Sequence, residues 1–213
     1  MNMNFDFGEW YYNEATIAER TLANRAFSFE PLFEDMKFSP GTPAGELTKI
    51  GIRDAGGENW TETYMDMPVS IQYASCQFVK FIVTEPENDS DACYNNQEQS
   101  ICISPDLIDD DTVLLHEMIH FYESAVNELP LYFHDALLWS LYSDLKGKIP
   151  KLDAIITDNA HILIESTLYT DGGLHDILFL LKSFDLDIRN GYPLGSVFGY
   201  GREERFKEYT YQI

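Results

Sequence analysis

The chain has 213 residues, of which 45% are apolar and 14% aromatic, enough for a hydrophobic core in one domain. Its 36 acidic and 14 basic residues give a formal net charge of −22, so we expect a surface that repels nucleic acid and anionic membranes. We expect no membrane-spanning helix, because no run of about 18 apolar residues occurs.

The cysteines and the first residues bear on the compartment in which the protein works. Cys76, Cys93 and Cys102 are too few for a disulfide scaffold, and no two of them have C-x-x-C spacing. The N-terminal residues lack the basic and apolar segments of a signal peptide. We therefore expect a reduced, cytoplasmic protein.

The part of the chain before residue 104 predicts one helix and then a small, mostly antiparallel sheet. Asn13 is suited to cap a helix over residues 13–25. Runs rich in β-branched and aromatic residues favour short strands. These runs cover residues 47–52, 64–67, 69–73, 76–84 and 101–103. Residues 85–100 are polar and acidic, which predicts a surface loop.

The part of the chain after residue 130 predicts helices. Apolar residues at helical spacing favour three of them. The predicted helices cover residues 132–146, 149–170 and 174–184. Gly147 and the pair Gly172-Gly173 are expected to end the first two. No element is predicted for residues 190–213.

Residues 116–120 read His-Glu-Met-Ile-His, an H-E-x-x-H pentad. Two histidines four apart on a helix project from one face, about one turn from each other, and can reach one metal ion. Glu117 stands where it can take a proton from a metal-bound water. This is the helix of zinc-dependent peptidases. The pentad therefore predicts Zn²⁺ bound by His116 and His120, with Glu117 as general base.

The residues around the pentad predict the helix that it needs. The three aspartates at 109–111 are suited to a helix N-terminus. An apolar stripe at helical spacing comprises Leu115, Met118, Ile119, Tyr122 and Val126. The neighbouring stripe comprises His116, His120, Glu123 and Asn127. One side of this helix is therefore expected to face a core and the adjacent side a metal site.

A catalytic zinc needs a third protein ligand. The metzincin pattern is excluded, because Glu123 and Val126 stand where it needs glycine and histidine. Glu165 is a candidate on a later helix. His134 is a candidate at the start of the next helix, since a short connector keeps neighbouring helices close. The other candidates that stay open are His161, His175, Glu123 and Glu128.

The segment around the pentad resembles the strand–helix core of SprT-like metalloproteases, which include Spartan. The residues that carry the resemblance are Ile101-Cys102-Ile103-Ser104-Pro105 and Leu114-Leu115-His116-Glu117-Met118-Ile119-His120, within about residues 100–140. The resemblance implies a zinc peptidase whose third histidine, at the start of another helix, is His134.

This chain also departs from that family. Tyr132-Phe133-His134-Asp135 replaces the Gly-His-Gly-Pro neighbourhood usual around the third histidine, and no cysteine-rich zinc ribbon follows. A net charge of −22 leaves no basic surface for DNA. The resemblance therefore does not imply repair of DNA–protein crosslinks.

Together these patterns predict an α+β fold of zincin type, as one metallopeptidase-like domain over residues 1–213. Residues 1–126 are expected to form a lobe of helix, sheet and metal helix, and residues 127–213 a mostly helical lobe. The expected function is hydrolysis of peptide bonds in a protein or peptide substrate, with Zn²⁺ on His116, His120 and His134. The alternative is a non-catalytic protein of zincin fold whose acidic surface binds a basic partner.

Overall fold

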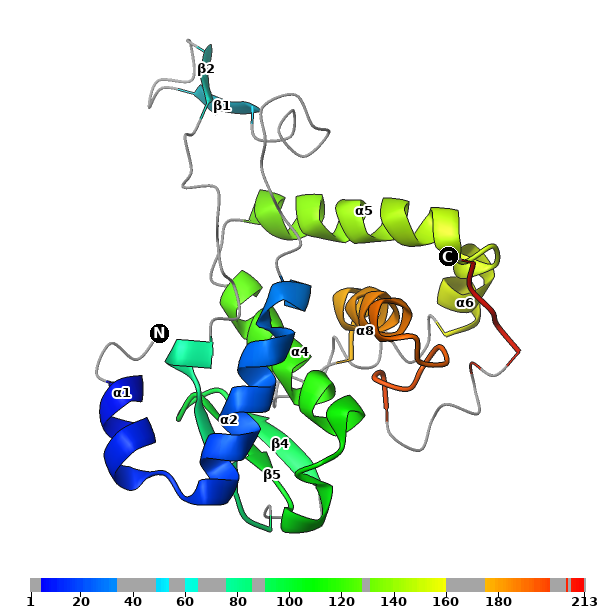
Figure 1. Cartoon of the computed structure of the whole chain (residues 1–213). Coiled ribbons are helices and arrows are strands. Elements are labelled where there is room, and N and C mark those ends of the chain that lie inside the picture. Colours follow the sequence, from blue (N-terminus) through cyan, green and yellow to red (C-terminus); the bar gives the residue numbers. More distant parts are fainter. Residues whose placement is uncertain are drawn as a thin grey trace.

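The structure is a computed structural model that describes residues 5–33, 49–53, 60–64, 76–85, 91–127, 131–159, 175–199, 206 and 208–212. In these residues the chain has an α+β fold, in which helices pack on a three-stranded sheet and on one another (Figure 1). None of the described helices is long and apolar enough to cross a membrane.

The three-stranded sheet is mixed, where the sequence predicted a mostly antiparallel one. It has the order β3-β5-β4. Its strands are β3 (Lys80–Val83), β4 (Ala92–Asn95) and β5 (Ser100–Ile103). β3 runs parallel to β5, whereas β4 runs antiparallel to it. A separate antiparallel pair is formed by β1 (Lys49–Arg53) and β2 (Trp60–Tyr64).

The strand predictions before residue 104 were only partly correct. β1, β3 and β5 confirm three predicted strands with shifted ends, but β4 lies inside residues 85–100, which were expected to form a loop. A 3-10 helix, η3 (Cys76–Phe78), replaces the start of the strand predicted at 76–84. Four residues of a polar stretch show no clear alternation, so β4 depends on its pairing with β5. The rest of the strands predicted at 64–73 lies outside the described residues.

The N-cap of the long N-terminal helix lies three residues later than predicted, at Thr16 and not at Asn13. A short α1 (Phe7–Glu9) and a π-helical turn η1 (Trp10–Glu14) precede α2 (Ile17–Phe29) and η2 (Glu30–Phe33). Thr16 and Glu19 form a capping box: the Glu19 N–H donates to Thr16 Oγ1 over 3.2 Å, and the Thr16 N–H donates to Glu19 Oε2 over 2.7 Å. This reciprocal pair, rather than Asn13, begins the helix.

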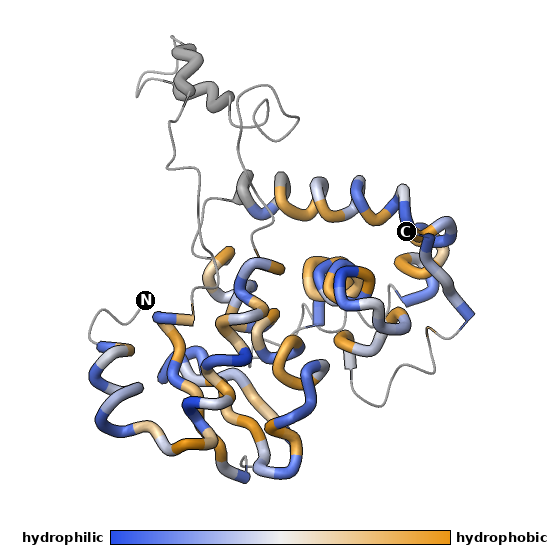
Figure 2. Tube along the Cα trace, in the orientation of Figure 1, coloured by the Kyte–Doolittle hydropathy of each residue, from blue (hydrophilic) through white to orange (hydrophobic). Residues whose placement is uncertain are grey.

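One face of the sheet is covered by α2 and by the helix of the pentad, α4 (Asp111–Asn127). The predicted acidic start of α4 is confirmed, since Asp110 Oδ1 accepts from the N–H groups of Thr112 (2.8 Å) and Val113 (3.3 Å). Ile101 and Ile103 of β5 are fully buried in the same core as the apolar stripe of α4. Figure 2 shows the hydrophobic stretches of the strands and of α4 gathered where these elements meet.

Two of the three helices predicted after residue 130 are confirmed with shifted ends, and the one predicted over residues 149–170 is found as a helix that ends at Asp158. α5 (Leu131–Lys148) continues through Gly147, α6 is Leu152–Asp158, and α8 is Ile177–Asn190. α8 begins at an Asp176 cap, whose Oδ1 accepts from the N–H groups of Leu178 (2.7 Å) and Phe179 (3.0 Å). It packs against both α4 and α5, and every side chain from residue 178 to 188 is buried. Residues 160–174 lie outside the described part.

Buried charges join α8 to the end of η2. Lys182 is fully buried, and its Nζ donates to the Leu32 carbonyl over 2.6 Å and to Asp185 Oδ2 over 3.0 Å. Arg189 Nε donates to the other oxygen of Asp185 over 2.9 Å. The Lys182 ammonium also lies 5.0 Å from the centre of the Phe33 ring. A buried charge is tolerated only when it is paired in this way, so the network fixes α8 against the N-terminal helices.

Gly147 and Gly191 occupy different backbone conformations near the ends of two helices. Gly147 lies inside α5, and Gly191 follows α8 with φ of +72°; an added Cβ meets nothing within 4 Å at either position. We expect Gly147→Ala to stabilise the fold by about 0.5 kcal/mol, because alanine is the better helix former. Gly191→Ala should destabilise it by about 1 kcal/mol, because a Cβ is strained at positive φ. Urea unfolding of both variants checks this pair, and equal midpoints would contradict it.

Candidate metal centre

Three histidines converge between α4 and the start of α8. His116 and His120 come from the pentad on α4, and His175 lies two residues before α8. Each histidine offers one ring nitrogen as a potential ligand atom, and these three nitrogens all lie within 4.8 Å of one another. His116 is only 5% exposed, and the other two are partly buried. The group can therefore hold a metal ion, and neutral imidazoles are ligands that zinc accepts.

The hydrogen bonds of His116 orient its ring for such a role. Its Nδ1 lies 2.8 Å from the Val197 carbonyl oxygen, which can only accept, so Nδ1 carries the proton. Nε2 of His116 is then free of hydrogen and faces Nε2 of His175 at 3.1 Å. With that tautomer of His116, His175 Nε2 can donate to His116 Nε2. A lone pair directed into the centre of the cluster is the arrangement that a metal ligand needs.

His120 is held by its surroundings in the neutral form. Burial lowers its pKa to about 3, and the neighbouring His175 adds to that shift. Its Nδ1 lies 3.7 Å from Oε2 of Glu123, which leaves Nε2 for a metal. Burial also raises the pKa of Glu123 well above its ordinary value, and the nearby Asp176 carboxyl adds to the rise. Glu123 is therefore a neighbour of the second histidine and not a member of the ligand group.

An aromatic side chain borders all three histidines. The Phe179 ring centre lies 4.8 Å from that of His116, 4.7 Å from that of His120 and 4.5 Å from that of His175. The Phe198 ring centre lies 5.5 Å from that of His175 and 5.9 Å from that of Phe179. Both phenylalanines are buried. Apolar walls of this kind keep water from one side of a metal site and strengthen the electrostatic interactions within it.

Glu117, which follows His116 on α4, is 3% exposed. Burial raises its pKa to about 8, although a hydrogen bond from the Tyr94 backbone N–H acts in the opposite direction. Glu117 does not belong to the group of potential ligands. It is therefore available as an acid or base, the role that the pentad predicts for it.

His134 was predicted as the third ligand, and the structure places His175 in that group instead. His134 lies in the first turn of α5, which begins beyond the C-terminal end of α4 (Figure 1). α8 packs directly on α4 and carries His175 to the pentad. The other candidates Glu128, His161 and Glu165 lie outside the described residues.

A sequence signal for His175 exists. Leu174-His175-Asp176-Ile177-Leu178-Phe179 has the same order of residue types as Phe133-His134-Asp135-Ala136-Leu137-Leu138. In both segments a His-Asp pair opens an apolar helix, so the pattern alone gives two equal candidates. The helix α8 also carries Lys182, Asp185 and Asp187 within its apolar run. Charges inside a buried helix require internal partners and often lie near functional sites.

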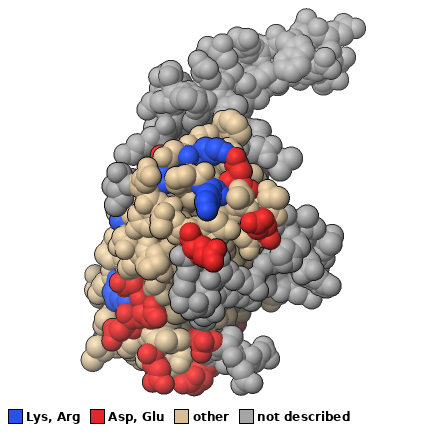
Figure 3. All heavy atoms as spheres, turned by 90° about the vertical axis from the view of Figure 1, so that its right-hand side faces the viewer, with Lys and Arg blue, Asp and Glu red and all other residues tan. Residues whose placement is uncertain are grey.

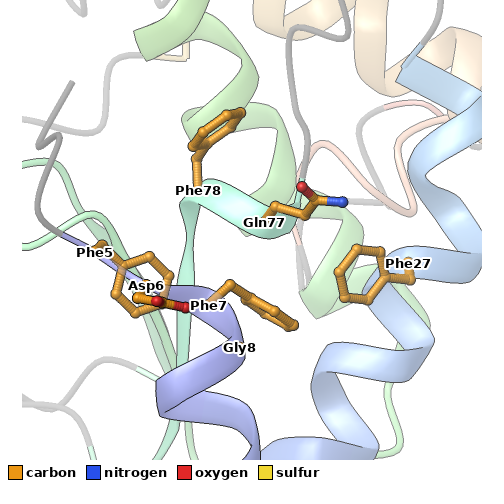
Figure 4. Close-up of a pocket in the computed structure, with 7 residues that line it drawn as sticks. All are labelled: Phe5, Asp6, Phe7, Gly8, Phe27, Gln77 and Phe78. Atoms are coloured by element: carbon orange, nitrogen blue, oxygen red, sulfur yellow. The ribbon is translucent and has the colours of Figure 1, made fainter.

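A hollow of about 550 Å³ lies elsewhere in the molecule, between α1, α2 and η3 (Figure 4). Its lining includes the rings of Phe5, Phe7, Phe27 and Phe78. No histidine lines it, and its one carboxyl group, Asp6, caps α1. The hollow is thus separate from the histidine cluster.

Comparisons with known proteins identify no relative: no family model, no curated protein and no solved structure matches this chain.

His175 belongs to the histidine cluster and His134 does not, so their replacement should affect zinc binding differently. We expect His175→Ala to lose most of the zinc affinity of the chain, because three converging imidazoles fall to two. His134→Ala, the matched control, should bind zinc as the unaltered protein does. Zinc titration against a chromophoric chelator measures both variants. The reverse result would restore His134 as the ligand.

Burial of the site also predicts how the stability of the metal-free protein depends on pH. The folded pKa of His120 is about 3 against an ordinary 6.5, so stability is lost as the pH falls through that window. The folded pKa of Glu117 is about 8 against an ordinary 4.5, so stability is lost as the pH rises through that window.

Glu117→Gln should therefore remove the alkaline decline in the metal-free protein, which we expect to be on the order of a few kcal/mol between about pH 5 and pH 8. Urea unfolding with a chelator present, at both pH values, measures the free energy of unfolding. An equal decline in the variant and the unaltered protein would show that another group causes it.

Proposed function

We propose that this protein is a zinc-dependent peptidase. The observation that carries the proposal is the convergence of His116, His120 and His175, with the buried carboxyl group of Glu117 carried by the residue that follows His116. A purely structural zinc site has no need of an ionisable group between two of its ligands. Three histidines also leave a fourth zinc position for water or substrate, as catalytic sites do.

The donor set fits zinc. His116, His120 and His175 would hold the ion through neutral ring nitrogens, and no cysteine belongs to the group. Bound zinc would polarise a substrate carbonyl, lower the pKa of water from about 15.7 to about 7, and favour the ionised form of the nearby Glu117.

Glu117 would move the proton. As a carboxylate it takes a proton from the attacking water, and as a carboxylic acid it gives that proton to the leaving amine. Its pKa of about 8 in the metal-free site shows how strongly burial favours the protonated form. The Tyr94 N–H holds the side chain in place in both states.

The edge of the sheet offers a place for an extended peptide. β4 pairs with β5 on one side, and in the described part of the chain no strand pairs with its other side. The Ser104 N–H donates to the Asp91 carbonyl of the same ladder over 3.0 Å. Along an antiparallel strand, residues that are hydrogen-bonded to the partner strand alternate with residues that are not. Counting from Asp91, Tyr94 is one of those that are not, so its N–H points away from β5 and toward Glu117. A substrate strand added to this edge would lie next to the proposed base.

The resemblance to SprT-like metalloproteases supports the same proposal, with a change in connectivity. The third histidine lies at the start of a helix, as that resemblance implies, but it follows α5 and α6 instead of coming directly after α4. Figure 3 shows groups of Asp and Glu over one face of the molecule and fewer Lys and Arg. We propose a protein or peptide substrate and no role for DNA.

Glu117→Gln tests the proposed base. We expect the variant to bind zinc like the unaltered protein, because Glu117 is not a ligand, and to lose at least about 100-fold in the rate of peptide hydrolysis. The rate is measured on a library of fluorogenic peptides with zinc-loaded protein.

Unchanged hydrolysis in Glu117→Gln would exclude Glu117 as the base. If the unaltered, zinc-loaded protein hydrolyses none of the peptides, the alternative of a non-catalytic protein that binds a basic partner through its acidic surface is favoured.

A further inference from the structure

Asp187 is a fully buried residue of α8 that holds the loop after that helix. Its Oδ2 accepts from the Gly195 N–H over 2.7 Å, and its Oδ1 accepts from the Val197 N–H over 3.0 Å. Both oxygens of one carboxyl group thus fix residues 195 and 197 relative to the helix axis.

The same loop, residues 191–199, reaches the histidine cluster at two points. The Val197 carbonyl accepts the proton on His116 Nδ1, and the Phe198 ring packs against His175. Val197 is therefore bound to Asp187 through its N–H and to His116 through its carbonyl. A shift of this one residue would turn the ring of His116 or leave its Nδ1–H buried without a partner.

We propose that Asp187 is a positioning residue for the metal centre. It acts through the loop backbone to fix the tautomer and the orientation of His116, so that Nε2 is presented to the ion. The inference rests on the zinc site of the proposed function and extends it to a residue that is not among the potential ligands. Outer partners of metal-bound histidines have this effect, and their loss costs about 10- to 100-fold in metal affinity.

The carboxyl group is needed because two N–H donors converge on it. An asparagine has the same shape but only one acceptor oxygen, and its amide N–H₂ would face one of the backbone N–H groups. Gly195 shows how tightly the loop is built: its φ is +90°, and an added Cβ would lie 2.3 Å from Cδ2 of Phe206. The loop therefore has little room to adjust around a weaker partner.

The test compares Asp187→Asn with Asp185→Asn. Both positions are buried on α8, and both variants lose one negative charge and keep the side-chain shape. Asp185 accepts hydrogen bonds from Lys182 and Arg189, which belong to α8 itself and not to the loop. We expect Zn²⁺ alone to bind Asp187→Asn about 10- to 100-fold more weakly, and Asp185→Asn as tightly as the unaltered protein, even where Asp185→Asn is the less stable of the two.

A second measurement reports on the ring itself. Nitrogen chemical shifts of the histidine rings in the metal-free protein should show His116 protonated at Nδ1 in the unaltered chain, and a mixture of tautomers in Asp187→Asn. If Asp187→Asn does not fold, Gly195→Ala displaces the same loop through Phe206 and should show the same loss of zinc affinity.

The outcomes separate the two proposals. No zinc binding by the unaltered protein would overturn the metal site itself. Equal zinc affinity in the unaltered protein and Asp187→Asn, with an unchanged His116 tautomer, would overturn the role of Asp187 and leave the site standing. An equal loss in Asp185→Asn would also overturn it, because the effect would then follow from charge or stability.

Discussion

The burial of α8 on all sides is the constraint on which the rest of this structure depends. A helix at the surface can turn its charged residues to water, but α8 buries every side chain from residue 178 to 188, including Lys182, Asp185 and Asp187. Each of these groups must find a partner inside the protein, since an unpaired buried charge costs several kcal/mol. The partners that they find are the elements that surround the metal centre.

The three charged residues buried in α8 fix two parts of the chain. Lys182 binds the carbonyl of Leu32 at the end of η2 and is paired with Asp185, which holds the N-terminal helices. Asp187 binds the loop that supports His116. The N-terminus of the same helix carries His175, and its first turn carries Phe179 beneath the three imidazoles. One helix and the residues just before it thus provide one histidine of the cluster, an aromatic wall and the support of a second histidine.

The sequence could predict those parts whose cause is local. The helix of the pentad, its aspartate cap and its apolar stripe follow from residues within one or two turns, and all of them are found in α4. The pairing of β4 and the choice of His175 over His134 are not local. Ala92 is buried and paired only because β5 lies beside it. His134 and His175 have similar neighbours in the sequence, and only the packing of α8 on α4 decides between them.

The contact between His116 and His175 shows which ring nitrogen each histidine turns toward the centre of the cluster. Two imidazole nitrogens 3.1 Å apart would repel each other if neither carried hydrogen, but one proton on His175 Nε2 makes the contact a hydrogen bond. A metal ion held by both histidines would take the place of that proton, and His175 would then carry its hydrogen on Nδ1. His116 does not need to change, because the Val197 carbonyl already holds its proton on Nδ1. A change of tautomer on metal binding would therefore fall on His175, which is partly buried just before α8, while the buried His116 would keep its tautomer.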